Sequence, residues 1–169
     1  MIFRQALALV AAVSRFATGA AFFILMGAVL VQVLGRTLFH SSPVWTEELT
    51  RFALLYVAAI GLGLAYRSGD LVNVDLVCES LPAPWPKLLR ALSALLTAML
   101  CLILIGPAWR FTSIGALQTS PALTWRMDFI HASMLVALVS LCIFSLARFL
   151  SIATGESDGL PQAVGEETP

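Results

Sequence analysis

Three long stretches of this chain contain no Asp, Glu, Lys or Arg, and this feature limits the possible folds more than any other. They cover residues 16–35, 92–109 and 129–147, and each is bounded by charged residues. The hydrocarbon core of a bilayer is about 30 Å thick, and a helix rises about 1.5 Å per residue, so roughly 20 apolar residues cross it. Each stretch is therefore predicted to be a transmembrane helix.

A fourth span is predicted where the charge-free stretch is shorter. Residues 52–66 would form only about 22 Å of helix, which is too short to cross alone. Ser42 as N-cap and Pro43 at the first helical position provide an upstream start. A helix over residues 45–66 is about 33 Å long, but its first turns then contain charged residues.

The composition agrees with a membrane protein, because 59% of the residues are hydrophobic and only 12% are charged. About a quarter of the residues of a typical soluble domain are charged. We therefore predict an all-α integral membrane protein with four transmembrane helices. The spans lie at about 16–36, 45–66, 88–109 and 127–148 in one membrane domain of residues 1–154, and residues 155–169 are predicted to be a disordered cytoplasmic tail.

Four spans place both termini on one side of the membrane. That side would hold six cations against four on the other, which favours cytoplasmic termini under the positive-inside rule. The six are Arg4, Arg15, Arg67, Lys87, Arg90 and Arg148, and the four are Arg36, Arg51, Arg110 and Arg126. The first fourteen residues are predicted to extend the first helix, with a signal peptide as the alternative.

Several classes of function are disfavoured by what the sequence lacks. The formal net charge is +0, and no polybasic run is present, so binding to nucleic acid is not expected. Cys78, Cys101 and Cys142 form no CxxC pair and are predicted to be structural thiols. No metal-ligand spacing or glycine-rich phosphate loop occurs, so we expect no cofactor, no metal and no catalytic residue.

The middle thirds of the four spans also contain no Asp, Glu, Lys or Arg. Transporters that move ions or anionic solutes normally keep ionisable groups or broken helices at the membrane midplane. Gly106 and Pro107 are predicted to form a kink rather than an ion site. His131 lies within the fourth span, but His40 is in the first outer loop, so paired haem ligands are not expected.

The strongest candidate site is the charged start of the second span, with Trp45, Glu47, Glu48 and Arg51. Glu47 and Arg51 are four residues apart and Glu48 and Arg51 three, so one arginine could bridge both carboxylates on one helical face. A solvated helix start is the alternative. Because the helix needs these residues to span, we expect the charged face to lie near the hydrocarbon edge and to require a protein partner.

The second span ends at Arg67 and Gly69, and a short amphipathic segment follows. Apolar residues recur at helical spacing over residues 71–81, before Pro82 and two further prolines turn the chain. We predict a short interfacial helix here, with a soluble loop as the alternative.

The segment WTEELTRFALLYVAAIGLGLAYRSGDLVNVDLVCESLP resembles the small, DctQ-type membrane subunit of tripartite ATP-independent periplasmic (TRAP) transporters. Residues 120–123, Ser-Pro-Ala-Leu, add a looser similarity. Asp70 and Leu71 depart from the family, which often has a histidine there, and Trp125 and Arg126 are more charged than its usual entry to span four. The positions that match the family pattern and are predicted to be structural or partner-facing are Trp45, Glu47, Glu48, Arg51, Arg67, Gly69, Asp75 and Pro82.

The resemblance implies a non-enzymatic scaffold subunit in a bacterial inner membrane. Its partners would be membrane lipid, a large multi-span permease that carries the sodium and substrate sites, and a periplasmic solute-binding protein. The implied function is sodium-coupled uptake of an organic acid, with no selection among acids. A membrane anchor of a redox enzyme and a self-sufficient small transporter are the alternatives.

Overall fold

The computed structural model describes residues 2–69 and 85–155, and most of these residues are helical. Four helices are each long and apolar enough to cross a membrane, which confirms the predicted fold class. Their bounds are α1 Ile2–Phe39, α2 Val44–Ser68, α4 Trp85–Gly115 and α5 Met127–Ala153. The predicted interfacial helix at residues 71–81, with Asp75 and Pro82, and most of the predicted tail lie outside the described residues.

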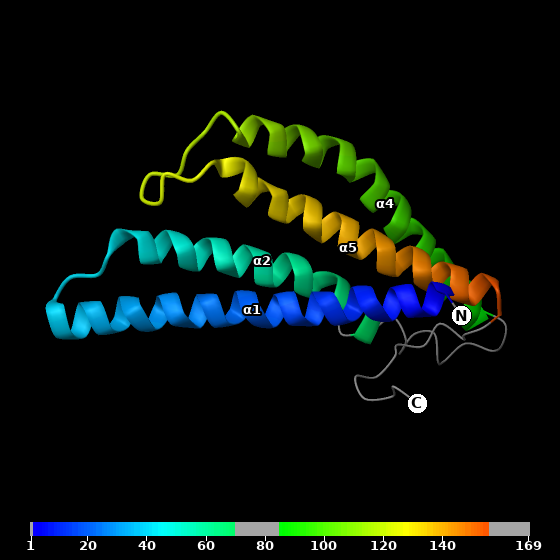
Figure 1. Cartoon of the computed structure of the whole chain (residues 1–169). Coiled ribbons are helices and arrows are strands. Elements are labelled where there is room, and N and C mark those ends of the chain that lie inside the picture. The colour runs from blue at the N-terminus through cyan, green and yellow to red at the C-terminus, as the bar shows by residue number, and fades with distance from the viewer. Residues whose placement is uncertain (1, 70–84, 156–169) are drawn as a thin grey trace.

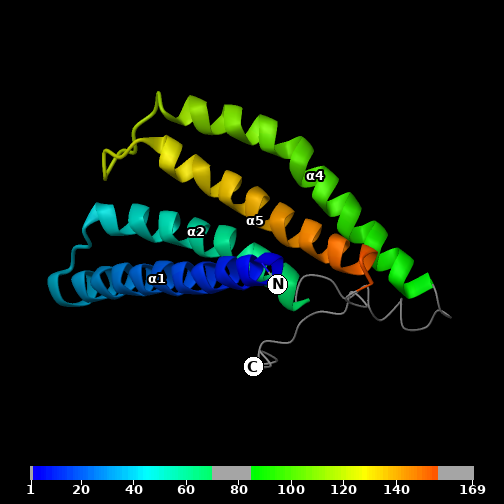
Figure 2. The same cartoon turned by 45° about the vertical axis from the view of Figure 1, so that its right-hand side comes forward.

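The four helices are arranged as a row in the order α1, α2, α5 and α4 (Figures 1 and 2). Extensive packing joins α1 to α2, α2 to α5, and α5 to α4. Other pairs of described helices make at most slight contact. The start of α1 and the end of α5 lie at the same end of the molecule (Figure 1), as an even number of spans requires.

Helix α1 is continuous from Ile2, which agrees with the prediction that the first residues of the chain extend the first helix. The start of the second helix differs from the prediction. Helix α2 begins at Val44 instead of Pro43, because Pro43 has an extended backbone with ψ of 129° and occupies the N-cap position. The predicted capping by Ser42 is therefore wrong by one residue.

Small residues set the close approach of α2 to its two neighbours. A Cβ atom at Gly63 would overlap the Ser140 hydroxyl and lie 2.8 Å from Phe144 of α5. The Gly61 position faces α1 instead, where its nearest neighbour would be Thr18 at 4.0 Å. Small side chains allow backbones to approach and increase dispersion contacts between membrane helices.

The buried core is small, and large apolar side chains cover the outer surface. Cys101, Ala108, Leu138 and Cys142 form one buried cluster between α4 and α5. Both of these cysteines are free and buried, as expected for structural thiols. Phe16, for example, is 81% exposed in the chain, as is appropriate for a surface that contacts lipid.

Candidate partner-binding site

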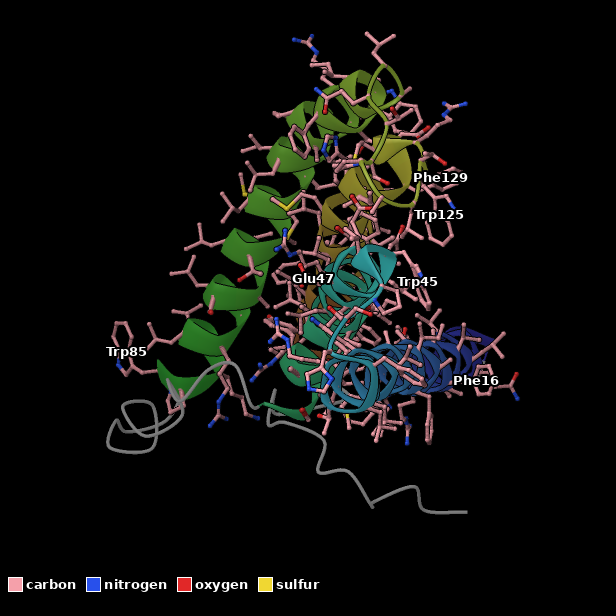
Figure 3. All side chains as sticks on the ribbon, turned by 90° about the vertical axis from the view of Figure 1, so that its left-hand side faces the viewer. Phe16, Trp45, Glu47, Trp85, Trp125 and Phe129 are labelled. Carbon is pink, nitrogen blue, oxygen red and sulfur yellow. The ribbon has the colours of Figure 1, made fainter. Side chains whose placement is uncertain are left out.

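The start of α2 lies beside the loop that connects α4 to α5. Trp45 and Glu47 come from the first turns of α2, and Trp125 comes from the loop; all three lie near one another at this end of the molecule (Figure 3). At the predicted outer end of the second span, the start of α2 thus meets the loop between α4 and α5.

Glu48 of α2 binds the loop between α4 and α5 through one carboxylate oxygen. Its Oε2 accepts hydrogen bonds from the Leu123 amide at 2.7 Å, the Ala122 amide at 3.1 Å and the Ser120 hydroxyl at 3.1 Å. Hydrogen bonds to a charged acceptor are roughly twice as strong as neutral ones. Glu48 is therefore a structural residue that holds a loop more than seventy residues away in sequence.

The loop is itself ordered by hydrogen bonds around Ser120, which is only 2% exposed. The Ser120 amide donates to the Trp125 carbonyl at 2.8 Å, and the Trp125 amide donates to the Ser120 hydroxyl oxygen at 3.3 Å. The Met127 amide, at the start of α5, donates to the Gln118 carbonyl at 2.9 Å. These hydrogen bonds within the loop help to hold the three donors in position for the Glu48 carboxylate.

The predicted bridge from Arg51 to the two glutamates is absent from the described structure. Glu48 is directed to the loop, where three donors converge, and Glu47 faces Gln32 of α1, whose Nε2 donates to Glu47 Oε1 at 3.5 Å. Arg51 is exposed and makes no ion pair with either glutamate within the described residues. The i, i+4 spacing permits a bridge, but in the structure Glu48 contacts the loop and Glu47 contacts Gln32 instead.

An open pocket of about 490 Å³ lies between the start of α2 and the loop. It combines apolar side chains with the free guanidinium of Arg51 and the exposed carboxylate of Glu47. Its lining residues are Val44, Trp45, Glu47, Glu48, Arg51, Pro121 and Ala122. An exposed arginine beside apolar surface is suited to contact with another protein.

Arg67 and Gly69 lie at the opposite end of α2 and do not join this pocket. Gly69 has a positive φ of 85°, and its amide donates to the Ala65 carbonyl, so it ends the helix in the left-handed conformation that glycine adopts without strain. Arg67 lies in the last helical turn, where a cation complements the helix dipole. Both positions are thus explained by helix termination.

His131 links α5 to the outer end of α4. Its Nδ1–H donates to the Phe111 carbonyl at 3.2 Å, and its ring stacks on the Phe111 ring with centroids 4.0 Å apart. Among the described residues, no group of three or more His, Cys, Asp or Glu side chains could hold a metal ion. The histidine therefore has a packing role that requires no ligand.

The model for the DctQ component of the tripartite ATP-independent periplasmic transporters matches residues 25–155, which include the whole of α2, α4 and α5. The chain belongs to the DctQ family. This match confirms the resemblance noted from the residues around α2 and extends it over most of the chain.

One curated relative of this DctQ protein is the "Sialic acid TRAP transporter permease protein SiaT" of Haemophilus influenzae (strain 86-028NP). The two are 24% identical over 140 residues, which cover 82% of this chain. The match covers only 23% of the relative, so this chain corresponds to less than a quarter of that permease.

Sequence reasoning identified Glu48 in this DctQ protein but did not identify its contact. Ser120 was noted only as part of a loose similarity, and Thr46, which is fully buried, was not singled out. Thr46 donates its hydroxyl to the Pro43 carbonyl at 2.6 Å and so stabilises the first turn of α2. The available sequence signal was a threonine directly after a tryptophan at the helix start, because threonine hydroxyls often hydrogen-bond to nearby backbone groups.

Proposed function

We propose that this DctQ protein is the small, non-enzymatic scaffold subunit of a TRAP transporter. In this proposal it supports sodium-coupled, binding-protein-dependent uptake of an organic acid by a large permease subunit. Family membership supports the transport role. The observation that carries the scaffold role is the absence of Asp, Glu, Lys and Arg from the middle of every described span, because ion-coupled carriers normally place such groups there.

The proposed location is a bacterial inner membrane with cytoplasmic termini. The positive-inside rule supports this orientation, because the end at which α1 begins and α5 ends is the richer in Lys and Arg. All six cations assigned to that end lie in described helices: Arg4, Arg15, Arg67, Lys87, Arg90 and Arg148. The pocket beside Trp45 then faces the outer side.

A carboxylate solute is proposed from the family resemblance and from the relative, which is named as a sialic acid permease. The described helices of this chain carry no Asp, Glu, Lys or Arg at the midplane that would select one acid. We therefore assign recognition of the solute to the large subunit and the binding protein. The small subunit would contribute a fixed surface against which the large subunit works.

The pocket at the start of α2 is proposed as the contact with the large subunit. Arg51 is the residue that best fits such a contact, because it is exposed and makes no internal ion pair with the glutamates beside it. A carboxylate of the partner would pair with its guanidinium, and Trp45 and Val44 would supply apolar contact.

This proposal is tested by co-expressing the chain with the permease and binding protein encoded beside it and measuring co-purification and sodium-dependent solute uptake. We expect Arg51→Leu to reduce both at least tenfold, which corresponds to the loss of one charged contact at an interface. Arg110→Leu is the matched control, because Arg110 is an exposed outer-end arginine on α4 that does not line the pocket.

Wild-type co-purification and uptake with Arg51→Leu would refute the role of the pocket. Sodium-driven uptake by this chain reconstituted alone would refute the scaffold function itself and favour a self-sufficient transporter. Visible haem absorption of the purified chain would instead support a redox anchor.

A further inference from the structure

Cys101 of α4 and Cys142 of α5 are two buried thiols that the proposed function does not use. Their residues are 2% and 6% exposed, and both belong to the buried cluster between these helices. Each lies within a charge-free stretch, residues 92–109 or 129–147, which we assign to the hydrocarbon core. Two such thiols can react with each other only if they lie at the same level and face one another.

The register of α4 and α5 follows from contacts at their outer ends. The two helices are neighbours and run antiparallel (Figure 1). The His131 ring stacks on the Phe111 ring with centroids 4.0 Å apart, so these two residues lie at nearly the same level. A Cβ atom at Gly115 would lie 2.9 Å from the Asp128 amide nitrogen, which gives the same register one turn farther out.

This register places Cys101 opposite Cys142. Cys101 lies ten residues inward from Phe111, and Cys142 lies eleven residues inward from His131. At a rise of 1.5 Å per residue, the levels of the two cysteines along the helices differ by only about 1.5 Å.

Both cysteines are also on the covered faces of their helices. The next residue along α4, Leu102, is 56% exposed, and the next residue along α5, Ile143, is 39% exposed. One step along a helix is a rotation of about 100°, so the exposed faces begin beside the two thiols and not at them. The side chains of Cys101 and Cys142 therefore meet in the interface between α4 and α5.

The helices approach closely enough here for a covalent link. Ala98 of α4 and Ser145 of α5 are small and fully or almost fully buried, and small residues allow helix backbones to approach. Packed helices have axes about 8–10 Å apart, and Cα atoms lie about 2.3 Å from each axis. Facing Cα atoms are then about 3–5 Å apart, and farther when the side chains point obliquely. A disulfide joins Cα atoms about 4.4–6.8 Å apart.

We propose that Cys101 and Cys142 form a latent disulfide site between α4 and α5, which a small, neutral, lipid-soluble oxidant of the halogen class closes. With molecular iodine, the first thiol sulfur attacks iodine, forms a sulfur–iodine bond and releases hydrogen iodide. The second thiol sulfur displaces iodide, forms the sulfur–sulfur bond and releases a second hydrogen iodide. The two thiols lose two electrons, and one iodine molecule gains them. This inference does not depend on the proposed transport function.

The test uses the unsubstituted full chain in phosphatidylcholine and phosphatidylglycerol vesicles at low protein density. The vesicles are treated with iodine, the excess is removed, and the remaining thiols are alkylated in the unfolded chain before digestion and mass spectrometry. We expect a peptide pair that links Cys101 to Cys142 and separates on reduction with dithiothreitol, and alkylation at Cys78 alone. Recovery of Cys101 and Cys142 as alkylated thiols would overturn the proposal.

A matched control moves one thiol by a single residue to the exposed face of α5. Both variants carry Cys78→Ser, so each has two cysteines, and the control also carries Cys142→Ala and Ile143→Cys. We expect the control to form the link at least about tenfold more slowly, because a disulfide needs Cβ atoms about 3.5–4.5 Å apart and the moved thiol points away from α4. Equal rates in the two variants would overturn the proposal.

Discussion

The hydrogen bonds that converge on Glu48 lead to a quantitative prediction for Glu48→Ala. The change removes the acceptor of three hydrogen bonds, two of them from backbone amides and one from the buried Ser120 hydroxyl. Hydrogen bonds to charged groups contribute about 1.5–3 kcal/mol each. Because the loop lies beyond the ends of α4 and α5, water replaces part of this, and we expect a loss of about 3–4 kcal/mol.

Glu48→Gln should cost less, about 1–2 kcal/mol, because the amide oxygen still accepts hydrogen bonds at the same place. Glu47→Ala is the matched control one residue away. Among the described residues, Glu47 makes one hydrogen bond, the exposed contact with Gln32 at 3.5 Å, so its loss should cost under about 0.5 kcal/mol.

The assay is thermal unfolding of the purified chain in detergent, together with hydrogen exchange of the Ala122 and Leu123 amides. We expect Glu48→Ala to lower Tm by roughly 10 °C and to accelerate exchange at both amides, and Glu47→Ala to leave both measurements close to wild type. Equal stability of the two alanine variants, with unchanged protection at residues 122 and 123, would refute the argument that this carboxylate holds the loop.

Two further predictions concern helix packing. Gly63→Ala should destabilise the chain by about 1–3 kcal/mol, because the added methyl group collides with α5, whereas Gly61→Ala has room and should be nearly neutral in the same unfolding assay. His131→Ala should cost about 1–2 kcal/mol by removing the hydrogen bond to the Phe111 carbonyl and the ring stack; a Tm equal to that of wild type would contradict the packing role.

The four spans were predictable because each depends on a local property, the length of a stretch without charge. The second span shows this well, since the need to borrow upstream residues correctly placed Glu47, Glu48 and Arg51 in the first turns of α2. The exact start was missed by one residue, because proline suits both the N-cap and the first helical position.

The partners of these charged residues could not be predicted from local spacing. Helical spacing favours ion pairs between Arg51 and the two acids, and it gives no information about a loop that folds back from residues 120–123. Glu48 finds three fixed donors there, which compete successfully with one flexible guanidinium. The order of the helices was equally hidden, because the close fit of Gly63 to α5 depends on residues far apart in the chain.

The side-by-side order of the helices has a consequence for how this protein can be built into anything larger. The described helices form a row that is one helix thick, with two broad faces and two edges and no lumen between the helices. A neighbouring protein can therefore be added along either face without displacing any contact between the described helices. Under the scaffold function that we propose, this row would widen a larger assembly in the membrane, and the neighbour would form the passage for solute.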